Sequence, residues 1–246
     1  MNSEVEARWV GSIVEQIKMA IALIALIIVL FWAWLHRPRP PIQPAARLAA
    51  EGGDASAQFN LGSIYQHGAG VPQDYKEAAR WYRLAASQGN ASAQSKLGFM
   101  YNDGQGVPQD YKEAVHWYKL AAKQGDALAQ YNLGVMFATH RGVPLDNVEA
   151  VRWLTLAAEQ GEASAQSNLG VMCAEGKGCL QDFVQAHKWF NLAGARGNSD
   201  AVRNRDIAAS EMTPQQIAEA QRQACEWKPT IPTVESGQAS SPAPLA

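Results

Sequence analysis

A period of 36 residues runs through most of this chain and limits the folds that it can adopt. Three markers recur at this spacing, a Leu-Gly pair, a tryptophan and a closing glycine: Leu61-Gly62, Leu97-Gly98, Leu133-Gly134 and Leu169-Gly170; Trp81, Trp117, Trp153 and Trp189; Gly89, Gly125, Gly161 and Gly197. A fixed period in this range predicts a solenoid, in which each copy buries its apolar face against the next. We expect full repeats at residues 54–89, 90–125, 126–161 and 162–197, and a half repeat at 45–53.

Each copy has the pattern of two α-helices. The first helix is expected after a capping residue, which is Asp54, Asn90, Asp126 or, less favourably, Glu162. The second is expected after Asp74, Asp110, Asp146 or Asp182, each followed three residues later by Glu or Gln, the spacing of a capping box. Apolar residues within both segments recur with the helical period. The sequence therefore predicts an all-α fold.

Two sets of glycines in each copy have structural explanations. In "GAGVPQD", Gly68 lies where the first helix should end, and Pro72 prevents the helix from continuing. A phosphate-binding loop would follow a strand or end in Gly-Lys-Ser/Thr, and neither is present. Gly62 and its equivalents lie inside a helix, where glycine costs about 1 kcal/mol relative to alanine. We expect the partner helix, with its Trp81-type ring, to approach closely there.

The repeated pattern "A-x-A-Q-x-x-L-G-x-x-Y-x-x-G-x-G-V-P-Q-D-Y-x-x-A-x-x-W-Y-x-x-A-A-x-Q-G" resembles the Sel-one-like repeat, a relative of the tetratricopeptide repeat. The resemblance covers residues 45–198. It implies a right-handed α-solenoid of antiparallel helix pairs that serves as a platform for protein complexes and has no catalytic activity. Residues 201–227 also resemble the ending of bacterial members. We expect capping helices within 198–227, with Thr213 as a helix cap and Pro214 at the first helical position.

The N-terminal segment differs from the repeats. Met19 to Leu35 is a run of 17 residues without a charge, which as a helix spans about 25 Å, the short end of a membrane crossing. A cleaved signal peptide is the alternative, but "HRPRPP" follows the run where a small-residue cleavage site would stand. We expect a leader at 1–18, a transmembrane helix at 19–35 and a Pro-rich spacer at 36–44.

This organisation predicts a single-pass protein of a bacterial inner membrane. The lysines and arginines on the two sides of the apolar run are too few and too evenly divided to assign the side of the repeat domain. Residues 228–246 are rich in Ser, Pro and Ala and lack periodicity, so we expect a disordered tail.

Composition argues against several classes of function. The 246-residue chain has a formal net charge of −2, so no broad basic surface for nucleic acid is expected. Its three cysteines and five histidines lack the spacing of metal ligands, and we expect neither a metal nor a cofactor. An enzyme would need a nucleophile, a base and an orienting group, and the spacing around His116 and His187 suggests none. We therefore expect no enzyme activity.

Three substitutions depart from the repeat pattern. His140 replaces the first loop glycine of the third copy, and histidine is disfavoured in the left-handed conformation, so a turn of different shape is expected. Cys173 and Cys179 stand where the first copy has Tyr65 and Val71. They are a candidate disulfide if the domain faces an oxidising compartment. The alternative is a pair of small buried hydrophobic residues.

The predicted binding surface is the face of each first helix opposite its Leu-Gly leucine, which lines the concave groove in tetratricopeptide-like solenoids. A solvated face is the simpler explanation, but several of these positions are apolar, which favours a peptide or protein groove. Neighbouring polar residues are expected to bind peptide backbone. The predicted partner-binding residues are Phe59, Asn60, Ser63, Ser95, Lys96, Phe99, Asn102, Tyr131, Asn132, Val135, Asn168 and Val171. The sequence thus predicts a membrane-anchored scaffold with a protein or peptide partner, and alternatively an envelope protein that binds a small molecule or glycan.

Overall fold

The computed structural model describes residues 18–19, 23–29, 31 and 44–230. The chain divides into two units, one of residues 1–42 with 69–71 and one of residues 43–68 with 72–246. The described residues of the first unit are helical at 18–19, 23–29 and 31.

Among the described residues, no helix has both the length and the apolar character needed to cross a membrane. Most of the leader (1–18), much of the predicted anchor (19–35) and all but the last residue of the spacer (36–44) lie outside them. The anchor therefore stays a prediction.

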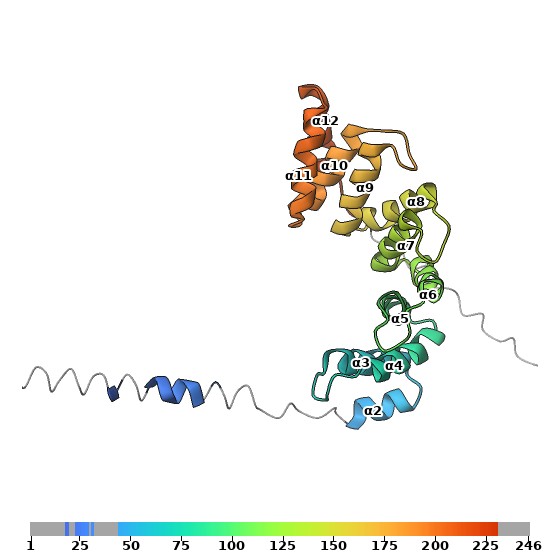
Figure 1. The fold of residues 1–246 in the computed structure, drawn as a ribbon, viewed down its shortest axis with the longest axis vertical. Helices are drawn as coiled ribbons and strands as arrows, with labels where there is room; N and C mark the ends of the chain where they lie inside the picture. Colours follow the sequence, from blue (N-terminus) through green and yellow to red (C-terminus); the bar gives the residue numbers. More distant parts are fainter. Residues whose placement is uncertain (1–17, 20–22, 30, 32–43, 231–246) are drawn as a thin grey trace, which may run out of the picture. The chain divides into compact units, whose positions relative to one another are not determined.

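The second unit is built from helices, and no strand occurs among its described residues. Figure 1 shows these helices following one another as antiparallel pairs. The first helices of the four repeats are α3 (Ala55–His67), α5 (Ala91–Asp103), α7 (Ala127–Thr139) and α9 (Ala163–Glu175). The second helices are α4 (Tyr75–Ser87), α6 (Tyr111–Lys123), α8 (Asn147–Glu159) and α10 (Phe183–Ala195). The half repeat is α2 (Pro44–Glu51), and α11 (Ser199–Ser210) and α12 (Pro214–Glu226) close the other end.

Helix N-termini lie where the capping residues predict them. The Asp126 carboxylate accepts the Ala129 N–H at 2.7 Å, and Asp110 accepts the N–H groups of Lys112 and Glu113 at 2.9 and 3.1 Å. The prediction of complete capping boxes at the second helices is wrong. The capping aspartate accepts backbone N–H groups as expected, but the side chain three residues later does not accept the backbone N–H of that aspartate. Glu149, for example, binds Arg152 and the Trp153 indole rather than the backbone of the capping aspartate. Within the described helices, the complete box is found at Thr213 and Gln216 of α12.

The glycines inside the first helices make room for a side chain of the second helix, but that side chain is not the predicted tryptophan. A Cβ atom added to Gly62 would lie 2.7 Å from the ring of Tyr82, the residue after Trp81. The same collision recurs at Gly98 with Tyr118 at 2.8 Å. In the last two repeats the partners are Leu154 and Phe190, at 2.8 and 2.6 Å. Because these side chains are buried, they determine how closely the two helices pack.

The hydrophobic core crosses the boundaries between repeats. One cluster joins Ala78, Tyr82 and Ala85 of α4 to Leu97 and Met100 of α5, and equivalent clusters follow along the chain. Each second helix is therefore stabilised by the first helix of the next repeat as well as by its own partner, as stacking in a solenoid requires.

A ladder of buried glutamines connects the same neighbours. Gln94 in α5 donates to the Ala86 carbonyl of α4 at 3.1 Å and accepts from the Gln124 amide at the end of α6 at 2.7 Å. The Ala86 carbonyl also accepts the Gly89 N–H at 3.0 Å, so the glutamine is a second donor to a carbonyl at the helix end. The buried glutamines at the equivalent positions of the other repeats are Gln58, Gln130 and Gln166. The repeat pattern contains both glutamines, but the sequence did not reveal that they pair.

The turn at His140 has the same conformation as the glycine turns, so the expectation of a different shape is wrong. His140 adopts φ 57° and ψ 38°, and its N–H donates to the Met136 carbonyl. Gly104 ends α5 at φ 70° and ψ 28° with the equivalent bond to Met100. The surrounding repeat therefore holds histidine in a left-handed conformation that glycine adopts more easily.

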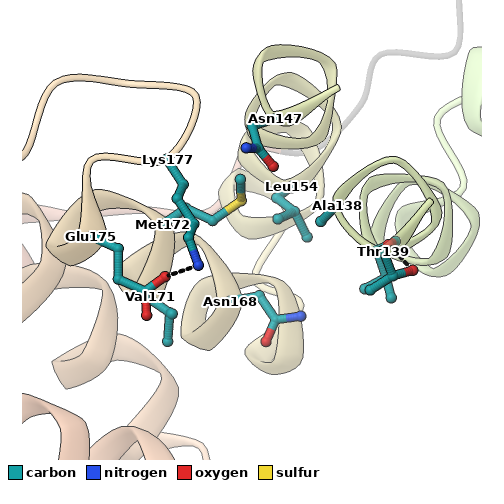
Figure 2. A pocket seen from close by; sticks show the side chains of 10 residues that line it. Ala138, Thr139, Asn147, Leu154, Asn168, Val171, Met172, Glu175 and Lys177 are labelled. Atoms are coloured by element: carbon teal, nitrogen blue, oxygen red, sulfur yellow. Dashed lines mark hydrogen bonds and ion pairs between the residues drawn. The ribbon is translucent and has the colours of Figure 1, made fainter. Parts of the chain in front are cut away.

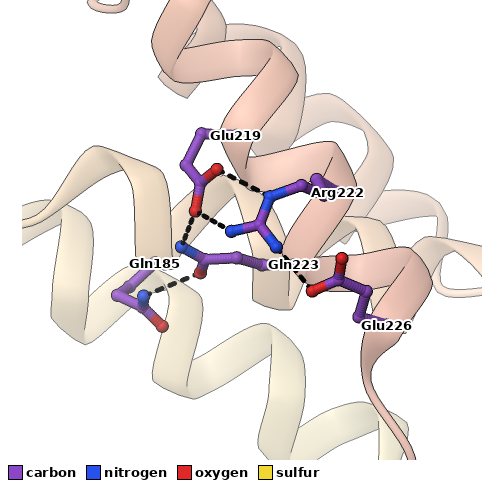
Figure 3. Close-up of polar contacts among 5 residues, drawn as sticks. All are labelled: Gln185, Glu219, Arg222, Gln223 and Glu226. Atoms are coloured by element: carbon purple, nitrogen blue, oxygen red, sulfur yellow. Dashed lines mark hydrogen bonds and ion pairs between the residues drawn. The ribbon is translucent and has the colours of Figure 1, made fainter.

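The two ends of the stack follow the expected organisation with small shifts. Pro44, assigned to the spacer, is the first residue of α2, where its missing N–H is tolerated. At the other end Figure 3 shows a polar link between α10 and α12, in which Gln185 donates to Gln223 at 3.0 Å. Arg222 of α12 pairs with Glu219 and Glu226 at 2.7 and 2.6 Å.

The chain continues beyond α12 for a few described residues. The N–H of Thr230 donates to the Glu159 carbonyl of α8 at 2.7 Å, so Lys228 to Thr230 do not belong to a free tail. The remainder of the predicted tail, 231–246, lies outside the described residues.

Candidate functional site

A hollow of about 220 Å³ opens between the first helices of the third and fourth repeats. Figure 2 shows side chains from α7, α8 and α9 around it. It is lined by Val135, Ala138, Thr139, Asn147, Leu154, Asn168, Val171, Met172, Glu175 and Lys177. Three of these, Val135, Asn168 and Val171, are predicted partner-binding residues. The structure therefore brings part of the predicted surface together in one concave site.

The lining of this hollow is largely apolar, and its two charged side chains neutralise each other. Leu154, 1% exposed, reaches it from α8 behind the two first helices. Glu175 and Lys177 form an ion pair at 2.7 Å, so their charges compensate each other. The Thr139 hydroxyl donates to the Val135 carbonyl at 2.7 Å within its own helix. The hollow thus offers apolar contact with few polar groups, the usual character of a binding site.

A second hollow of about 320 Å³ lies on the other side of α9. It is lined by Val171, Ala174, Glu175, Phe183, Phe190, Asn204, Ile207 and Ala208. Val171 and Glu175 belong to both hollows. We call the two hollows together the α9 groove.

Helix α11 contributes to this groove as a fifth first helix, which the sequence analysis did not identify. Asn204 lies 36 residues after Asn168, and Ile207 lies 36 residues after Val171. Ile207 is 66% exposed. The continuing 36-residue register was the available signal, although the Leu-Gly marker is absent from α11.

The aromatic residues among the predicted partner-binding residues lie elsewhere and do not line either hollow. Phe59 is half-buried, with its ring 5.6 Å from that of Tyr82. Phe99 is 37% exposed. Tyr131 is half-buried, and burial raises its pKa.

The predicted polar residues also lie outside the α9 groove, Asn168 excepted. Asn60 is exposed, and Lys96 and Asn132 are half-buried. The Ser63 hydroxyl lies 3.4 Å from the His67 Nδ1, and Asn102 donates to Asp103 at 2.6 Å.

Ser95 is the one predicted partner-binding residue whose side chain is buried. Its hydroxyl donates to the Asp126 carboxylate at 3.1 Å, and Asp126 caps α7. This bond links two neighbouring repeats and occupies the hydroxyl. Ser95 therefore belongs to the packing between repeats rather than to the predicted binding surface.

The fourth repeat places its two cysteines together as thiols. Cys173 is buried, and burial together with the neighbouring Cys179 raises its pKa to about 12. Cys179 is half-buried, and its thiol lies 3.6 Å from the Met172 carbonyl oxygen. A thiol with so high a pKa is a poor nucleophile near neutral pH, because the thiolate is the reactive form. The disulfide stays a prediction. No cluster of three or more His, Cys, Asp or Glu suited to a metal is found in the described part of the chain.

Comparison with known proteins identifies the family. The Sel1 repeat model matches residues 55–90, 91–126, 127–162 and 163–198. This chain belongs to the Sel1 repeat family. The boundaries of the matched segments follow the first helices α3, α5, α7 and α9, one residue after each capping position. The family model ends at residue 198, so α11 and α12 extend the Sel1 repeats by a further helix pair.

Solved structures support the same architecture. A Sel1 repeat protein from Oxalobacter formigenes is 33% identical, with a TM-score of 0.62, over 74% of this chain and 77% of that protein. A protective antigen of uropathogenic Escherichia coli, described as displaying an SLR fold, is 30% identical with a TM-score of 0.52. The match covers 74% of this chain but only 47% of the antigen. No protein with a curated description matches the chain.

Proposed function

We propose that this Sel1-repeat protein is a membrane-anchored scaffold that binds a segment of a partner protein in the α9 groove. The apolar hollow between α7 and α9 carries the proposal. Val135 of α7 and Val171 of α9, both predicted partner-binding residues, border this open hollow and are half-buried. Sel1 repeats generally mediate protein–protein interactions, which supports a protein partner.

The anchor is the second part of the proposal. The uncharged run of 19–35, next to the Pro-rich spacer 36–44, has the composition of a single membrane-spanning helix. The two structural relatives described above come from bacteria, so we place the proposed anchor in a bacterial inner membrane. The side of the membrane that holds the repeats is left open. The test is carbonate extraction of membranes. The anchor is supported if the full-length chain stays in the membrane fraction and a variant that lacks 19–35 does not.

An envelope protein that binds a glycan or small molecule is the alternative function. The aromatic residues Phe59, Phe99 and Tyr131 of the predicted surface would allow such a ligand. These residues do not line the α9 groove, whose first hollow is mainly aliphatic. A sugar needs many directed hydrogen bonds, and besides the paired Glu175 and Lys177 the polar side chains of that hollow are Thr139, Asn147 and Asn168. The lining therefore favours a protein segment.

The test is a peptide selection followed by a substitution that fills the first hollow. A displayed library of random peptides is selected on the full-length protein, and the affinity of a selected peptide is measured by fluorescence anisotropy. Thr139 is exposed at the rim of the hollow, so Thr139→Trp places an indole there without disturbing the core. Affinity is expected to fall about tenfold or more, because the peptide loses the burial of one apolar side chain.

The matched control is His67→Trp, at the equivalent exposed position of the first repeat. This variant is expected to bind the selected peptide as the native chain does. Equal binding by Thr139→Trp would overturn the α9 groove as the site. Selection of no peptide, together with binding on a glycan array, would support the alternative function instead.

A further inference from the structure

The fourth repeat differs from the others in the loop that joins its two helices. Cys173 and Cys179 replace an aromatic residue and a valine of the repeat pattern, and Leu180 replaces the proline that follows the valine. Leu180 is 91% exposed, so it does not restrain the loop by packing. In the third repeat, Phe137 and Val143 both pack against the core. The loop of the fourth repeat therefore has smaller core contacts and lacks the fixed backbone angle of a proline.

The two cysteines lie close together where this loop returns to α9. The Cys179 thiol is 3.6 Å from the Met172 carbonyl oxygen, which belongs to the peptide group that leads directly into Cys173. The N–H of Asp182 donates to the Cys173 carbonyl at 2.9 Å, so the end of the loop is attached to the same turn of α9. Both cysteine side chains contact one core cluster, Cys173 as a buried member and Cys179 at its edge. The fold thus brings two thiols of one repeat together.

We propose that Cys173 and Cys179 form a reversible disulfide that fixes this loop to α9 and strengthens binding in the α9 groove. The effect on binding rests on the proposed function, whereas the disulfide itself does not. In the reduced chain the Cys179 thiol lies 3.8 Å from the Lys177 carbonyl oxygen. Lys177 lines the first hollow and pairs with Glu175, which lines both hollows (Figure 2). A bond at Cys179 therefore acts two residues from a side chain of the binding site.

Oxidation proceeds by thiol–disulfide exchange with an external disulfide. Cys179 reacts first, because it is half-buried whereas Cys173 is buried and has a raised pKa. The Cys179 thiolate attacks one sulfur of the oxidant and releases the other as a thiolate. The Cys173 thiol then gives up its proton and attacks the Cys179 sulfur of this mixed disulfide, which releases the second thiolate. The pair loses two electrons and two protons, and the oxidant becomes two thiols.

The disulfide supplies a restraint that the loop otherwise lacks. Closing the segment 173–179 covalently lowers the conformational entropy of the unfolded chain, which stabilises the folded one. With Cys179 held, the neighbouring Lys177 has fewer conformations to lose when a partner segment binds. Oxidation is therefore expected to raise both the melting temperature and the affinity for the partner.

The first experiment tests the disulfide without any ligand. The full-length protein is equilibrated with glutathione disulfide or with reduced glutathione, and free thiols are alkylated before trypsin digestion and mass spectrometry. Trypsin cleaves after Lys177, between the two cysteines, so the disulfide would hold two tryptic peptides together until it is reduced. The melting temperature of the oxidised protein is expected to be about 5 °C higher than that of the reduced protein.

Two variants separate this pair from the third cysteine. Cys179→Val restores the valine that the other repeats hold at this position, so it should fold but show the same melting temperature in both buffers. Cys225→Ser is the control, because Cys225 is exposed and lies on α12. This variant should keep the full response to oxidation.

The second experiment measures the affinity of a library-selected peptide for the oxidised and the reduced protein by fluorescence anisotropy. The oxidised protein is expected to bind about two- to tenfold more tightly, which corresponds to the ordering of one long side chain in advance. Cys179→Val should bind the peptide equally in both buffers.

The outcomes separate this inference from the proposed function. Thiols that stay free in glutathione disulfide, or that become linked only after denaturation, would identify two small buried hydrophobic residues and overturn the inference, with peptide binding unaffected. A disulfide that forms without changing the affinity for the peptide also overturns it and leaves the groove intact. Selection of no peptide in either buffer overturns the proposed function, and linked tryptic peptides would then still support the disulfide.

Discussion

Single residues set the distance between the two helices of each repeat. A glycine on the first helix faces the ring or branched side chain that follows the tryptophan on the second. The sequence predicted close approach at these glycines, because a helical glycine recurred four times at a cost that needs an explanation. It did not identify the facing residue, since Trp81 and Tyr82 are adjacent and the period alone does not say which side chain points at the glycine.

Gly98→Ala is expected to lower the free energy of unfolding by about 1–3 kcal/mol, although alanine is the better helix former. The new Cβ atom would lie 2.8 Å from the ring of Tyr118, which is 1% exposed and has no room to move. The free energy is measured by urea denaturation. Ser92→Ala, at an exposed position of α5, is the control and should not destabilise the protein. A stability gain for Gly98→Ala would contradict the packing role.

His187 gives the protein a pH-dependent contribution to stability. It is 3% exposed, and its pKa is lowered, first by burial and then by Arg205, with Asp206 acting in the opposite direction. Because the folded pKa lies below the ordinary value of about 6.5, protonation favours the unfolded chain. This contribution is therefore present above about pH 6.5 and decreases as the pH falls below that value.

His187→Val should remove this contribution, since the equivalent positions of the preceding repeats hold Val115 and Val151. Urea midpoints at pH 7.5 and at pH 5.5 measure the effect. The native chain should lose more stability between the two pH values than the variant does. His116→Val, at an exposed site, should retain the native pH dependence. Identical pH profiles for the native chain and His187→Val would exclude His187 as the cause.

At the scale of helices, boundaries were predictable because each helix carries its own local signals. Asp, Asn and Thr caps, the glycines after the first helices and the position of Pro214 all act within a few residues of one another. The glutamine ladder and the Ser95–Asp126 bond join residues about 30 positions apart, so local patterns do not reveal them.

The candidate site was predicted in part for a similar reason. The face of the first helices could be deduced from the helical period, which identified Val135, Asn168 and Val171. Helix α11 was expected as a capping helix, but its place in the groove was missed because Arg205 and Asp206 occupy the positions of the Leu-Gly marker. The sequence also does not give the depth of a surface, which depends on side chains such as Leu154 that reach it from the second helix.

Gln94→Met tests whether the glutamine ladder holds neighbouring helices together. Methionine fills a similar volume but leaves the Ala86 carbonyl and the Gln124 amide without their buried partner. The free energy of unfolding is expected to fall by about 1–3 kcal/mol, because two buried hydrogen bonds worth about 0.5–1.5 kcal/mol each are lost. Urea denaturation measures this change. Gln215→Met, at an exposed position of α12, is the control, and an equal effect of both substitutions would refute the role of the ladder.

At the scale of the whole repeat domain, stability is transmitted between neighbouring repeats. Core clusters and the glutamine ladder join each repeat to the next, so each end of the stack needs a cover. At the C-terminal end, α11 and α12 provide it, and Trp227 follows them. Its ring lies 6.4 Å from that of Trp189 in an edge arrangement, and the Arg196 guanidinium lies 5.1 Å from it.

Trp227→Ala is expected to destabilise the C-terminal end of the stack selectively. The lost ring and cation–π contacts are worth about 1–2 kcal/mol, and they stabilise α10 directly. Because a solenoid behaves as a chain of nearest neighbours, the loss should decline with distance from that end. Hydrogen exchange should show reduced amide protection in α9, α10 and α12, with α3 and α4 unchanged. Lys228→Ala, at the exposed next residue, should preserve the native pattern. A uniform loss of protection from α3 to α12 would instead mean that the repeats unfold as one cooperative body.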